Sequence, residues 1–257
     1  MIGVDGVRER WLGAVLELDP SGDRPPLVSW LLGSAVEVLG AVDPDVVGCG
    51  IDVPVGLMTA GPRAAEQQAR ALLGPTSGSS IFATAPQPAF AVARRLGGTR
   101  TSRGEADAAS RAAGAGGIST QAWGIADKVL EVEDAVRALG PAGDRVVEVH
   151  PETSFAMMAR HFGLPAPSSK RSAPGAAQRI GLLSRTVTGL DVVSALAAVP
   201  DGRATVHRVP VDDALDALAA ACSALRHAYG RATVLGAGAT AVWSDGSPAP
   251  GRAVLVV

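Results

Sequence analysis

The sequence opens with MIGVDGVRERWLGAVLELD (residues 1–19), in which two apolar stretches flank a short charged turn. Both stretches have the composition of strands, and the tight turn between them predicts an antiparallel pair. LVSWLL at 27–32 predicts a third strand of the same meander. Asp5 lies inside the first predicted strand, where aspartate is disfavoured. A carboxylate in the interior of a sheet requires an explanation from the rest of the chain.

The composition is that of a globular protein. The chain has 257 residues, which suits one large domain or two small ones, and 47% hydrophobic residues against 19% charged residues exclude a disordered chain. The formal net charge of -2 does not predict general nucleic-acid binding. Cys49 and Cys222 lie in apolar contexts, which indicates buried thiols in a reducing compartment. Without a signal-like segment or a membrane-length apolar run, we expect a cytoplasmic protein.

Strands and helices alternate along the remaining chain. The continuous apolar run at 45–57 (DVVGCGIDVPVGL) predicts a central strand buried on both faces. Pattern and capping signals predict further strands at 145–152, 241–247 and 252–257, and helices at 34–42, 61–74, 120–139, 153–163, 175–186, 190–199 and 209–230. A mixed α/β fold with an antiparallel element at its beginning follows, and we expect one domain over 1–257.

Residues 75–117 have a different composition, rich in Gly, Ser, Thr, Pro and Ala. A long irregular segment of this kind predicts an insertion or lid with one helix near 89–97. Its arginines either contact phosphates or form a solvated surface: Arg94, Arg95, Arg100, Arg103 and Arg111.

Carboxylates occur at several places where burial disfavours them. Asp5 lies in the first strand, Asp52 ends the apolar part of the central run, and Asp213 and Asp216 lie three apart at the start of the last long helix. Asp213 also fits the ordinary preference of acids for a first helical turn, but Asp216 is one turn further on. Converging carboxylates repel unless a cation lies among them, and Mg²⁺ or Mn²⁺ prefers oxygen ligands. The pattern predicts a divalent-metal site for phosphoryl chemistry.

Several blocks, in order, resemble the domain-of-unknown-function family four-twenty-nine, described as predicted RNase H-like nucleases. The blocks are GVDGVRERWLGAVLE, GIDVPVGL, GPRAAEQQAR, SSIFATAP, EVHPETSF and DDALDALAAA. The resemblance covers nearly the whole chain. It implies the ribonuclease H-like fold, a five-stranded mixed sheet whose first three strands are antiparallel, flanked by helices. It also implies that Asp5, Asp52, Asp213 and Asp216 are the catalytic metal ligands.

Further site residues are predicted with less specific signals. Glu148 is a candidate catalytic residue, and His150 and Glu152 lie near it in the stretch EVHPE. The same stretch also fits a purely structural corner between a strand and a helix. Candidate substrate-binding residues stand in the blocks that resemble the family or beside the first strand: Arg8, Arg63, Ser80, Gln121 and Lys128. A helix face explains the last two equally well.

Three functions follow from these observations. The first is a metal-dependent nuclease or phosphodiester hydrolase acting on a nucleic acid or a nucleotide-like phosphodiester. The second is a non-catalytic binding or regulatory protein on the same fold, which the acidic pI favours. The third is a nucleotide-binding phosphotransferase, which ranks lower because no glycine-rich phosphate hairpin follows Asp5. A membrane partner is not expected, and the sequence does not decide the oligomeric state.

Overall fold

The computed structural model describes residues 1–200, 209–249 and 251–257. The chain divides into two compact units. Unit 1 consists of Met1–Asp52, Leu139–Thr233 and Val256–Val257, and unit 2 consists of Val53–Ala138 and Val234–Leu255. Residues 75–117, predicted as an insertion, lie entirely within unit 2.

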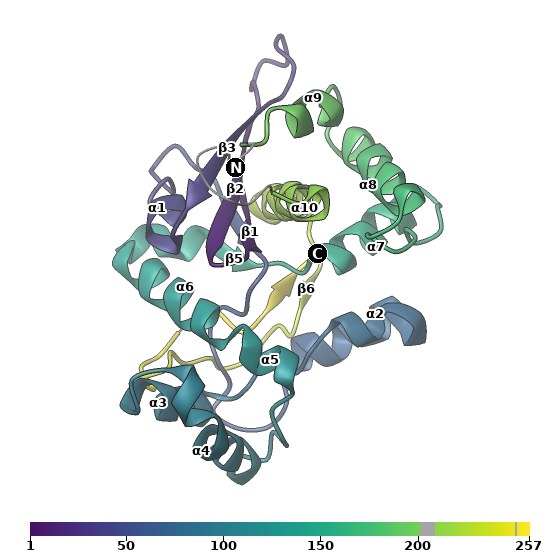
Figure 1. Cartoon of the computed structure of the whole chain (residues 1–257). Coiled ribbons are helices and arrows are strands. Elements are labelled where there is room, and N and C mark those ends of the chain that lie inside the picture. Colours follow the sequence, from purple (N-terminus) through teal and green to yellow (C-terminus); the bar gives the residue numbers. More distant parts are fainter. Residues whose placement is uncertain (201–208, 250) are drawn as a thin grey trace. The chain divides into compact units, whose positions relative to one another are not determined.

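Unit 1 is built on a five-stranded sheet with strand order β3-β2-β1-β4-β5. Its strands are β1 (Ile2–Val7), β2 (Arg10–Glu17), β3 (Leu27–Gly33), β4 (Cys49–Ile51) and β5 (Val146–Glu148). β1 pairs antiparallel with β2, and β2 with β3, whereas β4 is parallel to both β1 and β5. The predicted meander and the mixed sheet with helices around it are therefore confirmed (Figure 1).

The central strand is much shorter than the apolar run that predicts it. Only Cys49–Ile51 of residues 45–57 form β4. The Asp52 N–H still donates to the Val4 carbonyl at 3.0 Å, but the chain then leaves the sheet. Pro54 has no N–H to donate to a neighbouring strand, and Gly56 adopts a left-handed φ of 82° that does not fit a strand. The apolar residues after Asp52 belong to unit 2. Strand β4 thus ends directly before a carboxylate.

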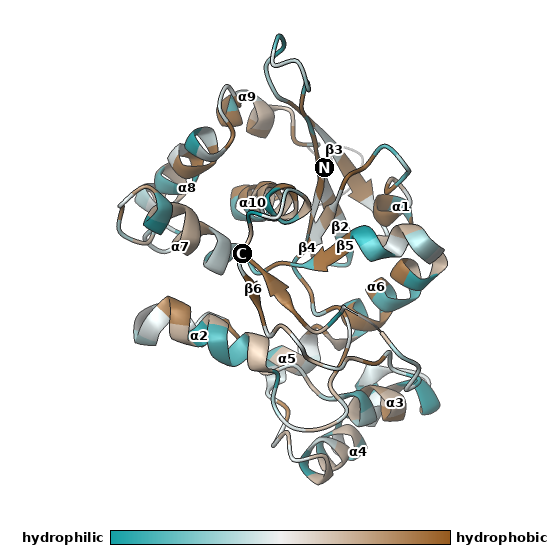
Figure 2. Ribbon diagram, turned by 180° about the vertical axis from the view of Figure 1, so that it is seen from behind, coloured by the Kyte–Doolittle hydropathy of each residue, from teal (hydrophilic) through white to brown (hydrophobic). Residues whose placement is uncertain are grey.

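Helices cover both faces of this sheet. α1 (Ala35–Leu39) contacts β2 and β3, and the Ser34 side chain caps its N-terminus in a capping box with Glu37. α10 (Val211–Ala228) packs on β1, β2 and β4 on the opposite face (Figure 1). Figure 2 shows the strands between them mostly in the hydrophobic colour.

The remaining helices of unit 1 pack around α10. They are α7 (Pro151–His161), α8 (Ala173–Thr186) and α9 (Val192–Ala197), with the short 3₁₀ segment η2 (Gly140–Arg145) before β5. α7 and α8 contact α10, and α9 contacts β3. The predicted strand at 145–152 ends early, because Pro151 begins α7. All the predicted helices of this unit are present with shifted ends.

Unit 2 is mainly helical. Its elements are α2 (Ala64–Ser77), η1 (Gly78–Ser80), α3 (Gln87–Arg95), α4 (Thr99–Ala112), α5 (Thr120–Gly124), α6 (Ala126–Ala138) and β6 (Val234–Leu235). α2 continues past the predicted stop at Gly74, where a left-handed φ of 71° kinks it. The segment at 75–117 holds two substantial helices, α3 and α4, where one was predicted; its action as a lid stays a prediction.

The C-terminal strands are short. β6 pairs with β7 (Leu255–Val256) in a two-stranded sheet. The predicted strand at 241–247 contributes only isolated bridges through Val242. Gly246, with a φ of 84°, turns the chain so that Trp243 N–H bonds to the Ser247 carbonyl at 2.8 Å.

None of the described helices is both long and apolar enough to cross a lipid bilayer.

Candidate functional site

The packing of α10 on the sheet depends on glycine in two adjacent strands. A β-carbon at Gly3 of β1 would lie 2.0 Å from the Ala217 carbonyl oxygen and 2.2 Å from the Ala221 nitrogen. A β-carbon at Gly50 of β4 would lie 2.4 Å from the Ala220 carbonyl oxygen. Only glycine allows the helix backbone to approach the sheet this closely. The middle of α10 is thereby fixed against β1 and β4.

The same geometry brings the predicted carboxylates together. Side chains two residues apart share a strand face, so Asp5 follows Gly3 on the face that α10 covers. Asp52 stands two residues after Gly50, directly past the end of β4. Because β1 and β4 are adjacent and parallel, both carboxylates lie at one edge of the sheet. Asp216 is one helical turn before Ala220, which places it on the face of α10 that contacts the sheet.

These acids are largely removed from water. Asp5 is 8% exposed and Asp216 is 2% exposed, while Asp52 and Asp213 are half-buried. The Gly6 N–H donates to Asp5 Oδ1 at 2.7 Å. A buried carboxylate is costly unless it is paired or bound to a cation. The structure therefore answers the question raised by Asp5: it belongs to a buried group of acids from three elements.

The acids interact electrostatically. Burial raises the pKa of the Asp5 carboxyl, and the charges of Asp52, Asp216 and Asp213 raise it further. Burial is also the main cause of the raised pKa of Asp52, followed by the charge of Asp216. Burial raises the pKa of Asp216 too, although the charge of Lys170 opposes this shift. The arrangement disfavours simultaneous ionisation of Asp5, Asp52 and Asp216 unless positive charge is supplied.

Asp216 has one satisfied and one unsatisfied oxygen. Lys170 Nζ donates to Oδ2 at 2.7 Å. Oδ1 is buried and receives no hydrogen bond from the described residues. An acceptor left without a donor in a buried site is uncommon and points to a missing ligand or water. Lys170 was not among the residues predicted from the sequence. The one feature that marks it there is rarity, because the chain contains just two lysines.

The donor set has the chemistry of a magnesium or manganese site. Carboxylate oxygens are the ligands that these hard cations prefer, and the unsatisfied oxygen of Asp216 offers one of them. In the arrangement observed, however, the part of the chain that the structure describes holds no group of three or more His, Cys, Asp or Glu side chains positioned to hold a metal ion. Asp5, Asp52, Asp213 and Asp216 therefore fit a cation by chemistry and burial, and binding requires their side chains to close around it.

Glu148 lies on the other face of the sheet by register. It pairs with Ile51, whereas Val147 pairs with Gly50. The Val149 side chain faces Gly50, since a β-carbon there would lie 2.9 Å from Val149 Cγ2. Strand alternation then directs Glu148 away from α10. Its charge still contributes to the raised pKa of Asp52, and a catalytic role for Glu148 stays a prediction.

The rest of EVHPE forms a corner between β5 and α7. His150 precedes the first turn of α7, and its carbonyl accepts hydrogen bonds from Thr153. Arg179 Nη2 of α8 donates to both carboxylate oxygens of Glu152, at 3.0 and 2.9 Å. Arg179 is 1% exposed and also donates to the Ser168 carbonyl at 2.8 Å. In the observed arrangement Glu152 ties α7 to α8.

Arg8 is the predicted substrate-binding residue that belongs to unit 1. It is exposed in the two-residue turn between β1 and β2, with a left-handed φ of 53°. This turn follows β1 at the sheet edge where Asp5 lies. An exposed arginine there is available to an anionic substrate.

The other predicted substrate-binding residues belong to unit 2. Arg63 is buried and pairs with Glu66 at 3.2 Å, so it contributes to the interior of that unit. Ser80 is half-buried and donates to the Ser77 carbonyl at 2.8 Å. Gln121 is exposed on α5 and Lys128 is half-buried on α6. Their predicted contact with substrate stays a prediction.

Most arginines of 75–117 have partners within unit 2. Arg94 bonds to Asp134, Arg95 pairs with Glu105 at 2.8 Å, and Arg111 pairs with Asp107 at 2.8 Å. Arg103 donates to the Thr120 hydroxyl at 3.2 Å. These contacts support the interpretation of a solvated, salt-bridged surface.

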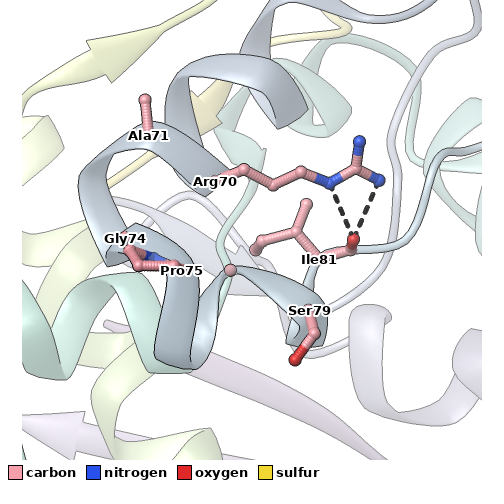
Figure 3. Close-up of a pocket in the computed structure, with 7 residues that line it drawn as sticks. Arg70, Ala71, Gly74, Pro75, Ser79 and Ile81 are labelled. Atoms are coloured by element: carbon pink, nitrogen blue, oxygen red, sulfur yellow. Dashed lines mark hydrogen bonds between the residues drawn. The ribbon is translucent and has the colours of Figure 1, made fainter.

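Unit 2 also has a concavity of about 710 Å³ beside the kink of α2. Arg70 lies along it and is fixed by two hydrogen bonds to the Ile81 carbonyl, at 3.0 and 2.9 Å (Figure 3). Gly74, Pro75 and Ser79 complete much of its wall. The predicted substrate-binding residues Arg63, Ser80, Gln121 and Lys128 do not line it.

The sheet, its helices and the buried acids define an α/β protein with a carboxylate cluster between strands and a closely packed helix. Comparison with known families then assigns the chain. It matches the family described as "Protein of unknown function (DUF429)" over residues 3–241, and it belongs to that family. This is the family that the sequence blocks resemble. No curated protein matches the chain. No solved structure matches it either.

Proposed function

We propose that this protein is a divalent-metal-dependent hydrolase of phosphodiester bonds, of the ribonuclease H-like type, with a nucleic acid or a nucleotide-like phosphodiester as its substrate. One observation carries the proposal. Carboxylates from β1, from α10 and from the residue that follows β4 interact in a largely buried group, and one oxygen of Asp216 has no hydrogen-bond partner among the described residues. Such a group is expected to bind a cation.

The proposed roles follow from position. Asp5, Asp52, Asp213 and Asp216 would hold Mg²⁺ or Mn²⁺. When bound, such an ion activates water and stabilises negative charge on the leaving oxygen. The strand residues are held by backbone pairing and Asp216 by the close packing of α10, so the ligands need only side-chain adjustment. Arg8 at the same edge would attract the phosphate. We place this activity in the cytoplasm, where free buried thiols such as Cys49 and Cys222 persist.

The test is cleavage of single-stranded, duplex and branched DNA and RNA with Mn²⁺ or with chelator. We expect metal-dependent cleavage that Asp5→Asn abolishes. The variant should remain folded, because asparagine is nearly isosteric and retains the oxygen that accepts from Gly6. Arg171→Met provides a matched control on an exposed side chain. Cleavage that survives both chelator and Asp5→Asn would refute the mechanism.

A second candidate function is non-catalytic binding or regulation on the same fold. The observation that favours it is the lack, among the described side chains, of three potential ligands already positioned around one ion. Calorimetry with Mn²⁺ and the cleavage assay together distinguish the two candidates. Binding of Mn²⁺ together with metal-dependent cleavage supports the hydrolase, whereas no cleavage of any of these substrates favours the binding protein.

A further inference from the structure

Lys170 places a positive charge against the buried acids. It lies in the segment at 164–172 between α7 and α8, 46 residues before Asp216. Its Nζ is 2.7 Å from Asp216 Oδ2, and its side chain is 36% exposed while that of Asp216 is 2% exposed. The ammonium group therefore reaches from solvent into the carboxylate cluster.

The chain on both sides of Lys170 is anchored to α8. The Ser168 N–H donates to Gln178 Oε1 at 2.7 Å, and the Ser168 carbonyl accepts from Arg179 at 2.8 Å. Ser172 caps α8, with its Oγ accepting from the Gly175 N–H at 3.1 Å. These bonds limit the positions available to the backbone at Lys170. The contact with Asp216 is thus prepared by the fold.

The charge of Lys170 is shared with several acids. Burial disfavours that charge, but the charge of Asp216 and the hydrogen bond to it raise the pKa of Lys170, and Asp5 and Asp212 raise it further. Lys170 also partly offsets the effect of burial on Asp52. A single ammonium nevertheless leaves Asp216 Oδ1 without a donor among the residues that the structure describes. The neutralisation of the cluster by Lys170 is incomplete.

We infer that Lys170 is a positioning residue that holds the Asp216 carboxylate in the metal-free protein and releases it to a divalent cation. This inference rests on the proposed metal site. In this proposal the ion takes both oxygens of Asp216, the open Oδ1 and the Oδ2 that Lys170 occupies, so metal binding breaks the Lys170–Asp216 bond. The partly exposed side chain of Lys170 can then turn to solvent or to a substrate phosphate.

The inference predicts that removing Lys170 strengthens metal binding. Calorimetric titration of the full chain with Mn²⁺ should give a Kd about five-fold lower for Lys170→Met than for the wild type, because the ion no longer displaces an ion pair. Lys170→Arg keeps the charge and should retain a Kd near the wild-type value. Arg171→Met is the matched control, since it removes an exposed charge from the next residue and should leave the Kd unchanged.

A stability measurement provides a second readout. Lys170→Met leaves Asp216 buried without a cation, so its Tm in chelator should be lower than that of the wild type, and Mn²⁺ should raise it more. Should Lys170→Met fail to fold, Lys170→Gln keeps a hydrogen-bond donor without the charge and should show the same direction in Kd. A purely structural role for Lys170 would lower the Tm without tightening Mn²⁺ binding.

The outcomes separate this inference from the proposed function. Equal or weaker Mn²⁺ binding by Lys170→Met would overturn the role of Lys170 and leave the metal site standing. An equal gain in affinity for Arg171→Met would also overturn it, because the effect would be one of general charge. No Mn²⁺ binding by the wild type or any variant would overturn both the inference and the metal site.

Discussion

Substituting Gly3 with alanine tests the contact that places the acids of β1 and α10 together. The added β-carbon would lie 2.0 Å from the Ala217 carbonyl oxygen and 2.2 Å from the Ala221 nitrogen. Non-bonded heavy atoms pack at about 3.5 Å, so α10 would have to move away from β1 by about 1.5 Å. Both obstructing atoms belong to the helix backbone and cannot rotate aside.

The cost of this substitution follows from the rigidity of the contact. Inserting one methyl group into a packed core destabilises by about 1–3 kcal/mol. We expect the upper end, about 3 kcal/mol, because α10 contacts three strands and must shift as a whole. That is a large part of the roughly 5–15 kcal/mol by which domains are stable. The shift would also draw Asp216 away from Asp5 and weaken Mn²⁺ binding.

Two glycines provide matched controls. A β-carbon at Gly13 on the opposite sheet face would lie 2.9 Å from Val38 Cγ1, a side-chain atom that can move, so Gly13→Ala should cost about 1 kcal/mol or less. A β-carbon at Gly181 in α8 would meet nothing within 4 Å, and Gly181→Ala should stabilise by about 0.5–1 kcal/mol. Urea unfolding of the three variants measures these differences. A loss for Gly3→Ala no greater than for Gly13→Ala would refute the close packing of α10 on β1.

Three further predictions concern other parts of unit 1. Asp5→Asn should raise the Tm of the metal-free protein, because it removes a buried charge that other acids repel, and a lowered Tm in chelator would contradict this account. Arg179→Met should lower the free energy of unfolding by about 3 kcal/mol, since it removes both hydrogen bonds from Arg179 Nη2 and leaves Glu152 without its cation. Urea unfolding measures this loss, and a change below about 1 kcal/mol would show that the ion pair is dispensable. Burial raises the pKa of the Cys49 and Cys222 thiols to about 12, so neither should react with a thiol reagent at about pH 8 until denaturant is added, and rapid reaction of the native protein would show that they are accessible.

The meander and the long helix were predictable because their signals are local. Alternating and continuous apolar runs predict β1, β2 and β3, and the helical pattern at 209–230 predicts α10 with ends that differ by two residues. The prediction of a 13-residue central strand was too long, because apolar residues beyond Asp52 are buried in unit 2 and not in the sheet. Burial alone does not reveal which core a residue joins.

The acids of the site could be selected from the sequence because they stand where strand and helix propensities disfavour a carboxylate. Asp5 inside a strand and Asp216 in the second turn of a helix both contradict ordinary propensity, which marks them without any structure. Their mutual effects on pKa, the contact of Asp216 with Lys170 and the direction of Glu148 were not predictable. Each depends on strand register or on a partner far away in the chain.

The sequence by itself determined the class of fold, the family and the carboxylates that ordinary packing does not explain. Only the tertiary structure decided that Lys170 pairs with Asp216, that Arg179 pairs with Glu152, and that Gly3 admits α10 close enough to bury the acids. The reason is physical: hydrophobic period and backbone propensity act over neighbouring residues, whereas ion pairs and close backbone contacts depend on distances that exist only after distant segments have packed.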